Sequence, residues 1–275
     1  MPELPEVETI VRSLREPPGA YATSVVGSRI AGANVLWPRT IANMESTEFV
    51  ERITGQEITS LNRRGKFLVF ALTKDTLLIH LRMSGDLRLE NVGTLVKKHD
   101  RLILSFMNNT QIVFNDTRKF GRVWLVEDAD EVLSKLGPEP LGADFSTDIF
   151  FSMLQAHSRQ IKPLLMDQHF LAGLGNIYTD EALHTAMIHP LAKSDQITRE
   201  ESSRLHAAIR SVLKEGILRN GASIDWVYRG GEFQNQFRVY GRAGEACPAC
   251  GSEIQRLVVG QRGTHICPFC QVLPD

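Results

Sequence analysis

The four cysteines of this 275-residue chain stand in two pairs that have the spacing of a metal site. Cys247 and Cys250 form one C-x2-C pair, Cys267 and Cys270 form the other, and sixteen residues separate the pairs. In a chain without a secretory signal, this spacing indicates metal binding rather than disulfides. Two such pairs fill all four positions of a tetrahedral Zn²⁺. We therefore predict one structural zinc ion.

The N-terminus offers a different kind of chemistry. If Met1 is removed, Pro2 becomes a secondary amine at the chain end, and the pKa of an α-amino group lies well below that of a lysine side chain. A larger share of such an amine is neutral near pH 7, and the neutral form is the nucleophile. Taken alone, Pro2 could equally be an ordinary residue behind the initiator methionine.

The first half of the chain predicts a helix followed by a β-rich block. Apolar side chains recur with helical spacing at Val7, Ile10, Val11 and Leu14. From about residue 25 to 126 the pattern changes to short strands, the clearest at 67–72, 77–81, 102–106, 111–114 and 123–126. We expect these strands to form a β-sandwich. The proline- and glycine-rich stretch 137–142 then predicts a linker.

The second half predicts helices and one hairpin. Thr198 and Glu201 form a capping box that opens a helix, and Asn220-Gly221 ends it. The glycine-punctuated stretch 171–178 leads into a helix expected at 180–186, whose first N–H groups suit a phosphate. Between the cysteine pairs, two short strands at 256–259 and 264–266 are expected. Arg262 then lies at the tip of a zinc-clamped hairpin.

Charge is distributed unevenly along a chain of net charge −1. Residues 60–122 contain twelve Lys/Arg against five Asp/Glu, whereas residues 123–150 contain one against seven. The basic segment is either a nucleic-acid surface or an ordinary solvated face. No apolar run reaches the roughly 20 residues that span a bilayer, and the acidic N-terminus lacks a signal core. We expect a cytoplasmic protein without a membrane partner.

Four separated stretches carry a resemblance to one family. They are Pro2-Glu-Leu-Pro-Glu-Val-Glu-Thr9, Arg63-Arg-Gly-Lys66, Gly173-Leu-Gly-Asn-Ile-Tyr178, and the cysteine finger with Gln261-Arg262. Over essentially the whole chain they resemble the bacterial formamidopyrimidine-DNA glycosylases, which act on 8-oxoguanine and ring-opened purines. The related endonuclease VIII branch acts on oxidised pyrimidines and usually opens with Pro-Glu-Gly-Pro-Glu, so Leu4 favours the purine branch.

The resemblance implies a base-excision repair enzyme that is both a DNA glycosylase and an abasic-site lyase working by β,δ-elimination. Pro2 would be the nucleophile that forms a Schiff base with the sugar. Glu3 would protonate the opening sugar, a task that requires burial. Lys66 would contact the damaged base and assist elimination. Arg262 would hold the lesion phosphate and help the second elimination.

The resemblance also implies residues that hold double-stranded DNA containing oxidised bases. Met83, Arg118 and Phe120 would fill the space left by the flipped base, with Arg118 pairing with the orphaned base. Phosphate contacts are expected for His99, Arg118, Arg159, Lys162 and Asn176. The family is typically monomeric, and a bacterial member would work at the nucleoid.

The fold class expected is α+β, with an N-terminal β-sandwich and flanking helices, a C-terminal helix–two-turns–helix domain, and a four-cysteine zinc-finger hairpin. The expected domains are a catalytic sandwich at 1–137, a linker at 138–146, a helical DNA-binding domain at 147–240 and the zinc finger at 241–275.

Two stretches depart from the family pattern. Residues 17–25 form an extended turn, and residues 221–233 are shorter than the stretch that covers flipped 8-oxoguanine in many members. The second departure leaves the lesion preference open. The same chemistry on oxidised pyrimidines is one alternative to the purine reading. The other is a non-catalytic protein that binds damaged DNA, for which a free N-terminal amine has no use.

Overall fold

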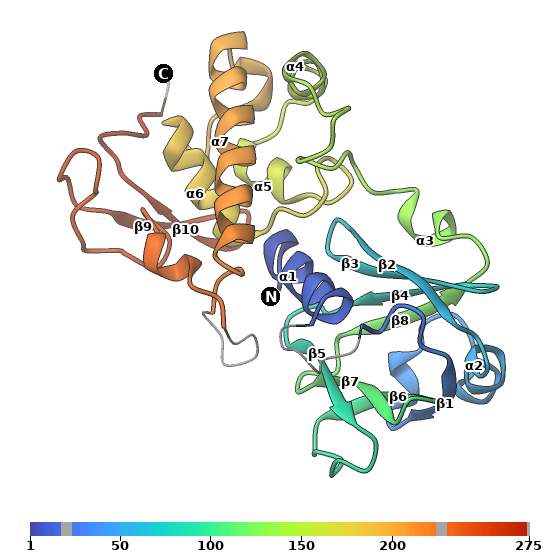
Figure 1. Ribbon diagram of the computed structural model, residues 1–275. Coiled ribbons are helices and arrows are strands. Elements are labelled where there is room, and N and C mark those ends of the chain that lie inside the picture. The colour runs from blue at the N-terminus through green and yellow to red at the C-terminus, as the bar shows by residue number, and fades with distance from the viewer. Residues whose placement is uncertain (18–23, 224–229, 274–275) are drawn as a thin grey trace. The chain divides into compact units, whose positions relative to one another are not determined.

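The structure is a computed structural model that describes residues 1–17, 24–223 and 230–273 (Figure 1). The chain divides into two compact units, each with its own hydrophobic core. The sheet unit contains Met1–Pro2 and Glu6–Ser134. The helical unit contains Glu3–Pro5, Lys135–Ala222 and the chain from Gly230 onward. Among the described residues, no helix has the length and apolar character that crossing a membrane requires.

The described part of the sheet unit is built on two antiparallel sheets of four strands each. One sheet has the order β1-β6-β7-β5, formed by β1 (Ile30–Val35), β5 (Gly85–Asn91), β6 (Asp100–Phe106) and β7 (Thr110–Asp116). The other has the order β2-β3-β4-β8, formed by β2 (Ile58–Arg64), β3 (Phe67–Leu72), β4 (Thr76–His80) and β8 (Arg122–Val126). Side chains from both sheets, such as Phe114 and Phe70, share one core. The predicted β-sandwich is confirmed.

Helices border this sandwich. In α1 (Leu4–Arg15), the predicted apolar stripe is buried, with Val7 0% and Val11 1% exposed. Glu8 of this helix forms an ion pair with Arg63 of β2, with 3.3 Å between Oε2 and Nε. The shorter elements of the unit are η1 (Pro38–Thr40), α2 (Ser46–Ile53) and α3 (Asp130–Leu133).

The helical unit contains the helices α4 (Thr147–Gln155), α5 (Ile161–Met166), α6 (Asn176–Ala186) and α7 (Arg199–Leu218), with 3-10 turns η2 (Ser194–Gln196) and η3 (Phe233–Gln236). The capping box of α7 is confirmed, because the Thr198 hydroxyl accepts the Glu201 N–H while the Glu201 carboxylate accepts the Thr198 N–H. Helix α6 begins at Asn176, earlier than the sequence predicted.

The expected hairpin is present in this unit. Strands β9 (Gln255–Val259) and β10 (Arg262–Ile266) are antiparallel, and Arg262 lies opposite Val259. Gln261 in the turn has a φ of 62°, so the chain reverses just before Arg262. This places the exposed Arg262 beside the tip, as the sequence predicted.

The two departures from the family pattern, 17–25 and 221–233, include residues 18–23 and 224–229. Those residues lie outside the part of the chain that the structure describes.

Candidate active site and nucleic-acid interface

Glu3 is buried, and its carboxylate accepts hydrogen bonds from the start of α6. The residue is 2% exposed. Its Oε2 accepts the N–H of Gly175 at 2.6 Å, and its Oε1 accepts the N–H of Ile177 at 3.0 Å. A Cβ at position 175 would lie 2.4–2.8 Å from the carboxyl atoms of Glu3, so the approach requires glycine. The burial expected for Glu3 is therefore present.

This arrangement corrects one expectation about the stretch that leads into α6. The N–H groups that were predicted to suit a phosphate are taken by a carboxylate of the protein itself. An anion does lie at the helix N-terminus, where the helix dipole favours negative charge. It is Glu3 and not a phosphate.

Pro2 and Lys66 are buried residues of the sheet unit. Lys66 is 4% exposed and directly precedes β3, in a turn whose Gly65 carbonyl accepts a hydrogen bond from Arg63 Nη1 at 3.0 Å. His80 pairs with Phe67, the neighbour of Lys66 in the chain. Burial, helped by the positive charges of Arg82 and Lys66, lowers the pKa of His80 to about 3. The imidazole beside Lys66 is therefore neutral at physiological pH.

The three residues expected to probe the duplex lie on two loops of the sheet unit. Met83, in the Met83 loop (residues 81–84) between β4 and β5, is 37% exposed, and Phe120 in the Arg118 loop (residues 117–121) between β7 and β8 is 48% exposed. Arg118 is exposed, and its guanidinium lies 5.1 Å from the centre of the Phe120 ring. Both loops therefore present apolar and cationic groups to solvent rather than to the core.

Lys162 does not meet the expectation of a phosphate contact. It is 0% exposed, and its ammonium donates to Asp180 Oδ1 at 2.6 Å, to Thr264 Oγ1 at 2.8 Å and to the Gly263 carbonyl at 3.1 Å. An ammonium has three N–H donors, and all three are used inside the protein. The predicted direct contact of Lys162 with DNA is wrong. The residue fastens the hairpin next to Arg262.

Asn176 supports the same hairpin. Its Nδ2 donates to the Gly263 carbonyl at 3.0 Å. Asp180 completes the group, because its Oδ2 accepts the backbone N–H of His265 at 3.0 Å and lies 3.3 Å from the His265 ring nitrogen. His265 is therefore largely buried against α6, with its side chain 11% exposed.

The remaining expected phosphate contacts differ in exposure. Arg159 is exposed, and its Nη1 forms an ion pair with Asp167 at 2.9 Å. His99 is half-buried, and its Nδ1 lies 3.3 Å from Arg101 Nη2. For both residues the phosphate contact stays a prediction.

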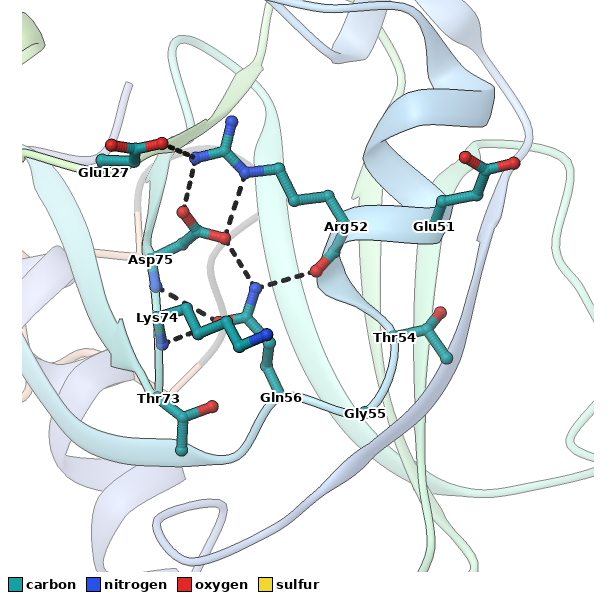
Figure 2. Close-up of a pocket in the computed structure, with 9 residues that line it drawn as sticks. All are labelled: Glu51, Arg52, Thr54, Gly55, Gln56, Thr73, Lys74, Asp75 and Glu127. Atoms are coloured by element: carbon teal, nitrogen blue, oxygen red, sulfur yellow. Dashed lines mark hydrogen bonds and ion pairs between the residues drawn. The ribbon is translucent and has the colours of Figure 1, made fainter.

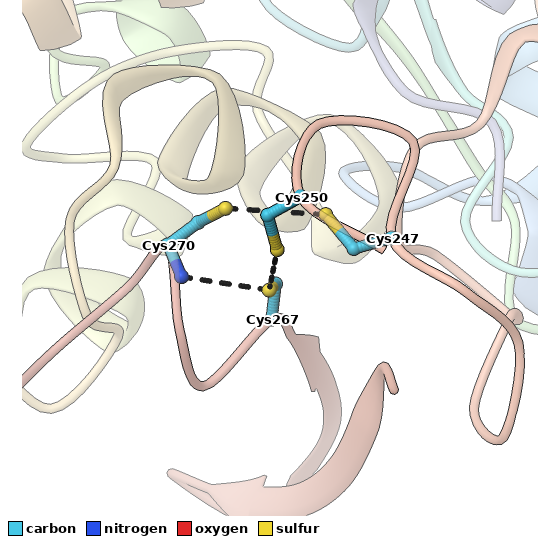
Figure 3. Close-up of side chains that lie close together, drawn as sticks. All are labelled: Cys247, Cys250, Cys267 and Cys270. Atoms are coloured by element: carbon cyan, nitrogen blue, oxygen red, sulfur yellow. Dashed lines mark hydrogen bonds between the residues drawn. The ribbon is translucent and has the colours of Figure 1, made fainter. Parts of the chain in front are cut away.

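The four cysteine sulfurs form a compact cluster (Figure 3). All of them lie within 4.8 Å of one another. Four soft sulfur donors at this separation fit one tetrahedral zinc ion and leave no coordination position for a substrate. His184 Nε2 lies 3.3 Å from Cys247 Sγ, within hydrogen-bond distance of that sulfur. The cluster fits the structural zinc ion predicted from the sequence.

A separate open pocket of about 630 Å³ lies on the sheet unit (Figure 2). Arg52 and Gln56 donate hydrogen bonds to the Asp75 carboxylate, while Gln56 Oε1 accepts the N–H groups of Lys74 and Asp75. Burial raises the pKa of Asp75, but these hydrogen bonds outweigh it and lower the pKa overall. The network fastens α2 to the β3–β4 turn, and the predicted site residues are not among those that line the pocket.

Sequence reasoning missed three buried carboxylates that hold in place the two exposed loops, the hairpin and the chain that leads into the finger. Asp116 lies beneath the Met83 and Arg118 loops, Asp180 pairs with Lys162, and Glu181 accepts the N–H groups of Arg238, Val239 and Tyr240. Asp116 stands two positions before Arg118, and Asp180 stands two positions after Tyr178. An acidic residue this close to a recognised motif could have been predicted to position the residues of that motif.

Three family models match consecutive parts of the chain. They are the formamidopyrimidine-DNA glycosylase N-terminal domain at residues 1–123, the formamidopyrimidine-DNA glycosylase H2TH domain at 136–227, and the zinc finger found in FPG and IleRS at 244–272. The formamidopyrimidine-DNA glycosylase of Chloroflexus aurantiacus is 44% identical over 282 residues, which cover 99% of this chain and 98% of the relative. The enzyme of the same name from Lactococcus lactis is 40% identical over 98% of this chain and 99% of its own.

Solved structures of the same family are similar to this chain over almost its whole length. A MutM in complex with DNA containing carbocyclic 8-oxo-G has a TM-score of 0.90 and 39% identity, covering 98% of this chain and 100% of that chain. The wild-type Lactococcus lactis Fpg (MutM) in complex with DNA containing N7-benzyl-Fapy-dG has the same TM-score, identity and coverage. The chain belongs to the formamidopyrimidine-DNA glycosylase family. The family resemblance and the fold class predicted from the sequence are confirmed.

Proposed function

We propose that this protein excises oxidised purines from double-stranded DNA and then cleaves the strand at the resulting abasic site. The family to which the whole chain belongs supports this activity. The observation that carries the proposal is at the N-terminus. There Pro2 is followed directly by a buried carboxylate, Glu3, that backbone N–H groups of α6 hold in place. An amine nucleophile thus has a fixed proton acceptor as its covalent neighbour.

In the proposed reaction the Pro2 nitrogen, exposed by removal of Met1, attacks C1′ of the damaged nucleotide. The base leaves with the electron pair of the glycosidic bond. Glu3 takes the proton from the newly bonded nitrogen and passes it to O4′ as the C1′–O4′ bond breaks. The product is an iminium ion between Pro2 and the opened sugar. Because this cation acidifies the C2′ proton, elimination of the 3′ phosphate follows with the assistance of Lys66, and Arg262 aids the second elimination.

The proposed contacts with DNA are made by exposed and half-buried residues. Met83 and Phe120 fill the gap left by the flipped base, and Arg118 pairs with the orphaned base. His99, Arg159 and Asn176 contact phosphates. The domain division proposed for this activity is 1–137, 138–146, 147–240 and 241–275. The protein acts as a monomer on the nucleoid of the bacterial cytoplasm.

Borohydride trapping on a duplex with 8-oxoguanine opposite cytosine tests the nucleophile. Mass spectrometry should find the adduct on Pro2, with Met1 absent. A Pro2→Gly variant should lose most base excision but still bind DNA, and a chain with one extra residue before Pro2 should form no adduct. Unchanged turnover in the Pro2→Gly variant would contradict the assignment.

The same assay separates the alternatives. Trapping on a thymine-glycol duplex but not on 8-oxoguanine would indicate the same mechanism with specificity for oxidised pyrimidines. Tight binding of damaged DNA without any adduct, in a chain that lacks Met1, would identify a non-catalytic binder.

For Lys66, the matched control is Lys74, an exposed lysine of the β3–β4 turn. Lys66→Ala should slow elimination, whereas Lys74→Ala should not.

A further inference from the structure

The Asp116 carboxylate lies where the Met83 loop and the Arg118 loop meet. Asp116 ends β7 and is 1% exposed. Its Oδ1 accepts the Ser84 hydroxyl and, at 3.1 Å, the N–H of Arg118. Its Oδ2 accepts the N–H of Gly121 at 2.7 Å. One buried side chain thus joins the Met83 loop to both ends of the loop that carries Arg118 and Phe120.

The same two loops rest on one aromatic ring. A Cβ at position 85 would lie 2.9 Å from Cε2 of Phe114, and a Cβ at position 121 would lie 2.3 Å from its Cζ. Glycine at both positions lets the two loops approach the ring closely. Phe114 is itself buried in the sandwich core. The base on which the loops rest is therefore rigid.

The main chain of Asp116 extends this support to neighbouring residues. Its N–H donates to the His99 carbonyl at 2.8 Å, and its carbonyl accepts Nε of the buried Arg101 at 2.8 Å. In the Arg118 loop, the Lys119 ammonium lies 3.8 Å from the centre of the Trp37 ring. The exposed residues of the two loops are Arg82 and Met83 in one and residues 117–120, which include Arg118 and Phe120, in the other.

We propose that Asp116 is a positioning residue that fixes Met83, Arg118 and Phe120 relative to one another, so that they enter the duplex as one unit. This inference rests on the proposed function. Filling a gap in a base stack and pairing with the orphaned base must happen together, because either alone leaves unstacked bases. A single carboxylate that accepts hydrogen bonds from both loops supplies that coupling.

The variant that isolates this role is Asp116→Asn. It keeps the shape of the side chain but turns one acceptor oxygen into an N–H donor. Whichever way the amide is oriented, one loop N–H, that of Arg118 or that of Gly121, faces a donor instead of an acceptor. Ser84→Ala is the milder second variant, since it keeps the Asp116 carboxylate and removes only the Ser84 hydroxyl, which donates to Asp116 and accepts the Arg118 N–H at 3.0 Å. Asp75→Asn is the matched control, because Asp75 is a buried aspartate in the turn that joins β3 and β4 of the other sheet.

Single-turnover cleavage of two substrates tests the inference. The first is a duplex with one damaged base, which requires gap filling. The second is a preformed abasic site in a single strand, which has no gap and no orphaned base. Asp116→Asn should slow the first by as much as about 10²-fold, the size of effect that a small misplacement of site groups produces. It should leave the second unchanged, and Ser84→Ala should fall between Asp116→Asn and the native protein.

A fluorescent 2-aminopurine next to the lesion supplies a readout of gap filling that is independent of chemistry. The change in fluorescence that DNA binding causes should be smaller in Asp116→Asn than in the native protein. In Asp75→Asn it should be the same as in the native protein. If Asp116→Asn matches Asp75→Asn on the duplex, or if both substrates slow together with a loss of thermal stability, the inference is wrong. If Asp116→Asn does not fold, a native duplex rate in Ser84→Ala overturns it. A native protein that cleaves neither substrate would instead overturn the proposed function.

Discussion

Two arginines predicted to contact DNA, Arg118 and Arg262, are presented by different constructions. Arg118 lies on a loop of a sandwich whose core combines two sheets and α1. Arg262 lies on a two-stranded hairpin, and the finger has a small core that consists of Val239, Cys247, Ile254 and Cys267 among the described residues. An isolated two-stranded hairpin is marginally stable in water. The finger therefore needs other sources of stability.

The contacts that fasten the two arginines differ accordingly. The Arg118 loop is held by hydroxyl and backbone N–H groups that donate to Asp116. The hairpin is held by a four-cysteine metal site and by the buried ion pair of Lys162 and Asp180. Where a large apolar core already supplies the folding energy, hydrogen bonds are enough to set a loop. Where the core is small, a metal and a charge pair must supply stability as well as position.

Of the changes that separate the two regions, removal of zinc should have the largest effect on stability. Chelation, or a Cys267→Ser substitution, should unfold the finger because structural zinc contributes on the order of 10–16 kcal/mol in zinc-finger peptides. The sheet unit should stay folded. Hydrogen exchange should show that β9 and β10 lose protection while β6 and β7 keep it. An equal loss of protection in the finger and in the sheet unit would contradict the view that only the finger depends on zinc.

Loss of the buried ion pair should come next. Lys162→Met leaves the Asp180 carboxylate buried without its cation, which costs about 3–5 kcal/mol. Denaturant unfolding measures this loss. A second substitution, Asp180→Asn, should recover part of it, because the charge is then gone while an oxygen can still accept the His265 N–H. If Lys162→Met is as stable as the native protein, the ammonium is not the anchor of the hairpin.

The sheet unit should show its own sensitivity, to acid, through His80. Burial lowers the pKa of His80 to about 3 in the folded protein, against about 6.5 in an unfolded chain. The unfolded state therefore binds more protons below pH 6.5, and stability falls as the pH falls from 6.5 towards 3. At pH 5 the loss is about 2 kcal/mol. The slope of unfolding free energy against pH should flatten in His80→Asn, and an unchanged slope would assign the sensitivity to another group.

Much of this contrast was predictable from the sequence because the motifs are local. The C-x2-C pairs, the capping box at Thr198 and the apolar stripe of α1 each need only neighbouring residues to be recognised. Strands β1, β2 and β5 were missed for the opposite reason. In β1, only Ile30 is fully buried, and the strand forms by pairing with β6, which lies far along the chain.

The errors at the site have the same physical origin. Lys162 looks like a surface cation in the sequence, and only its contact with Asp180 and with a hairpin about a hundred residues later makes it a buried anchor. The sequence gives no partner for the N–H groups at the start of α6, but in the structure they donate to Glu3, which stands 172 residues before Gly175. Which partner a charged group finds depends on tertiary structure, which residue spacing alone does not contain.

Arg159 should give the smallest effect on stability and so complete the contrast with Lys162. Both are cations of the helical unit, but the Arg159 side chain is 49% exposed and its pair with Asp167 lies at the surface. Exposed ion pairs contribute at most about 1 kcal/mol, so Arg159→Ala should barely change unfolding. If Arg159 contacts a phosphate, DNA affinity should fall equally for all sequences, and the salt dependence of log K should weaken by about one unit of slope. Arg199→Ala, which removes another exposed pair of the same unit with Asp148, should leave that slope unchanged. An unchanged slope in Arg159→Ala would remove Arg159 from the DNA interface.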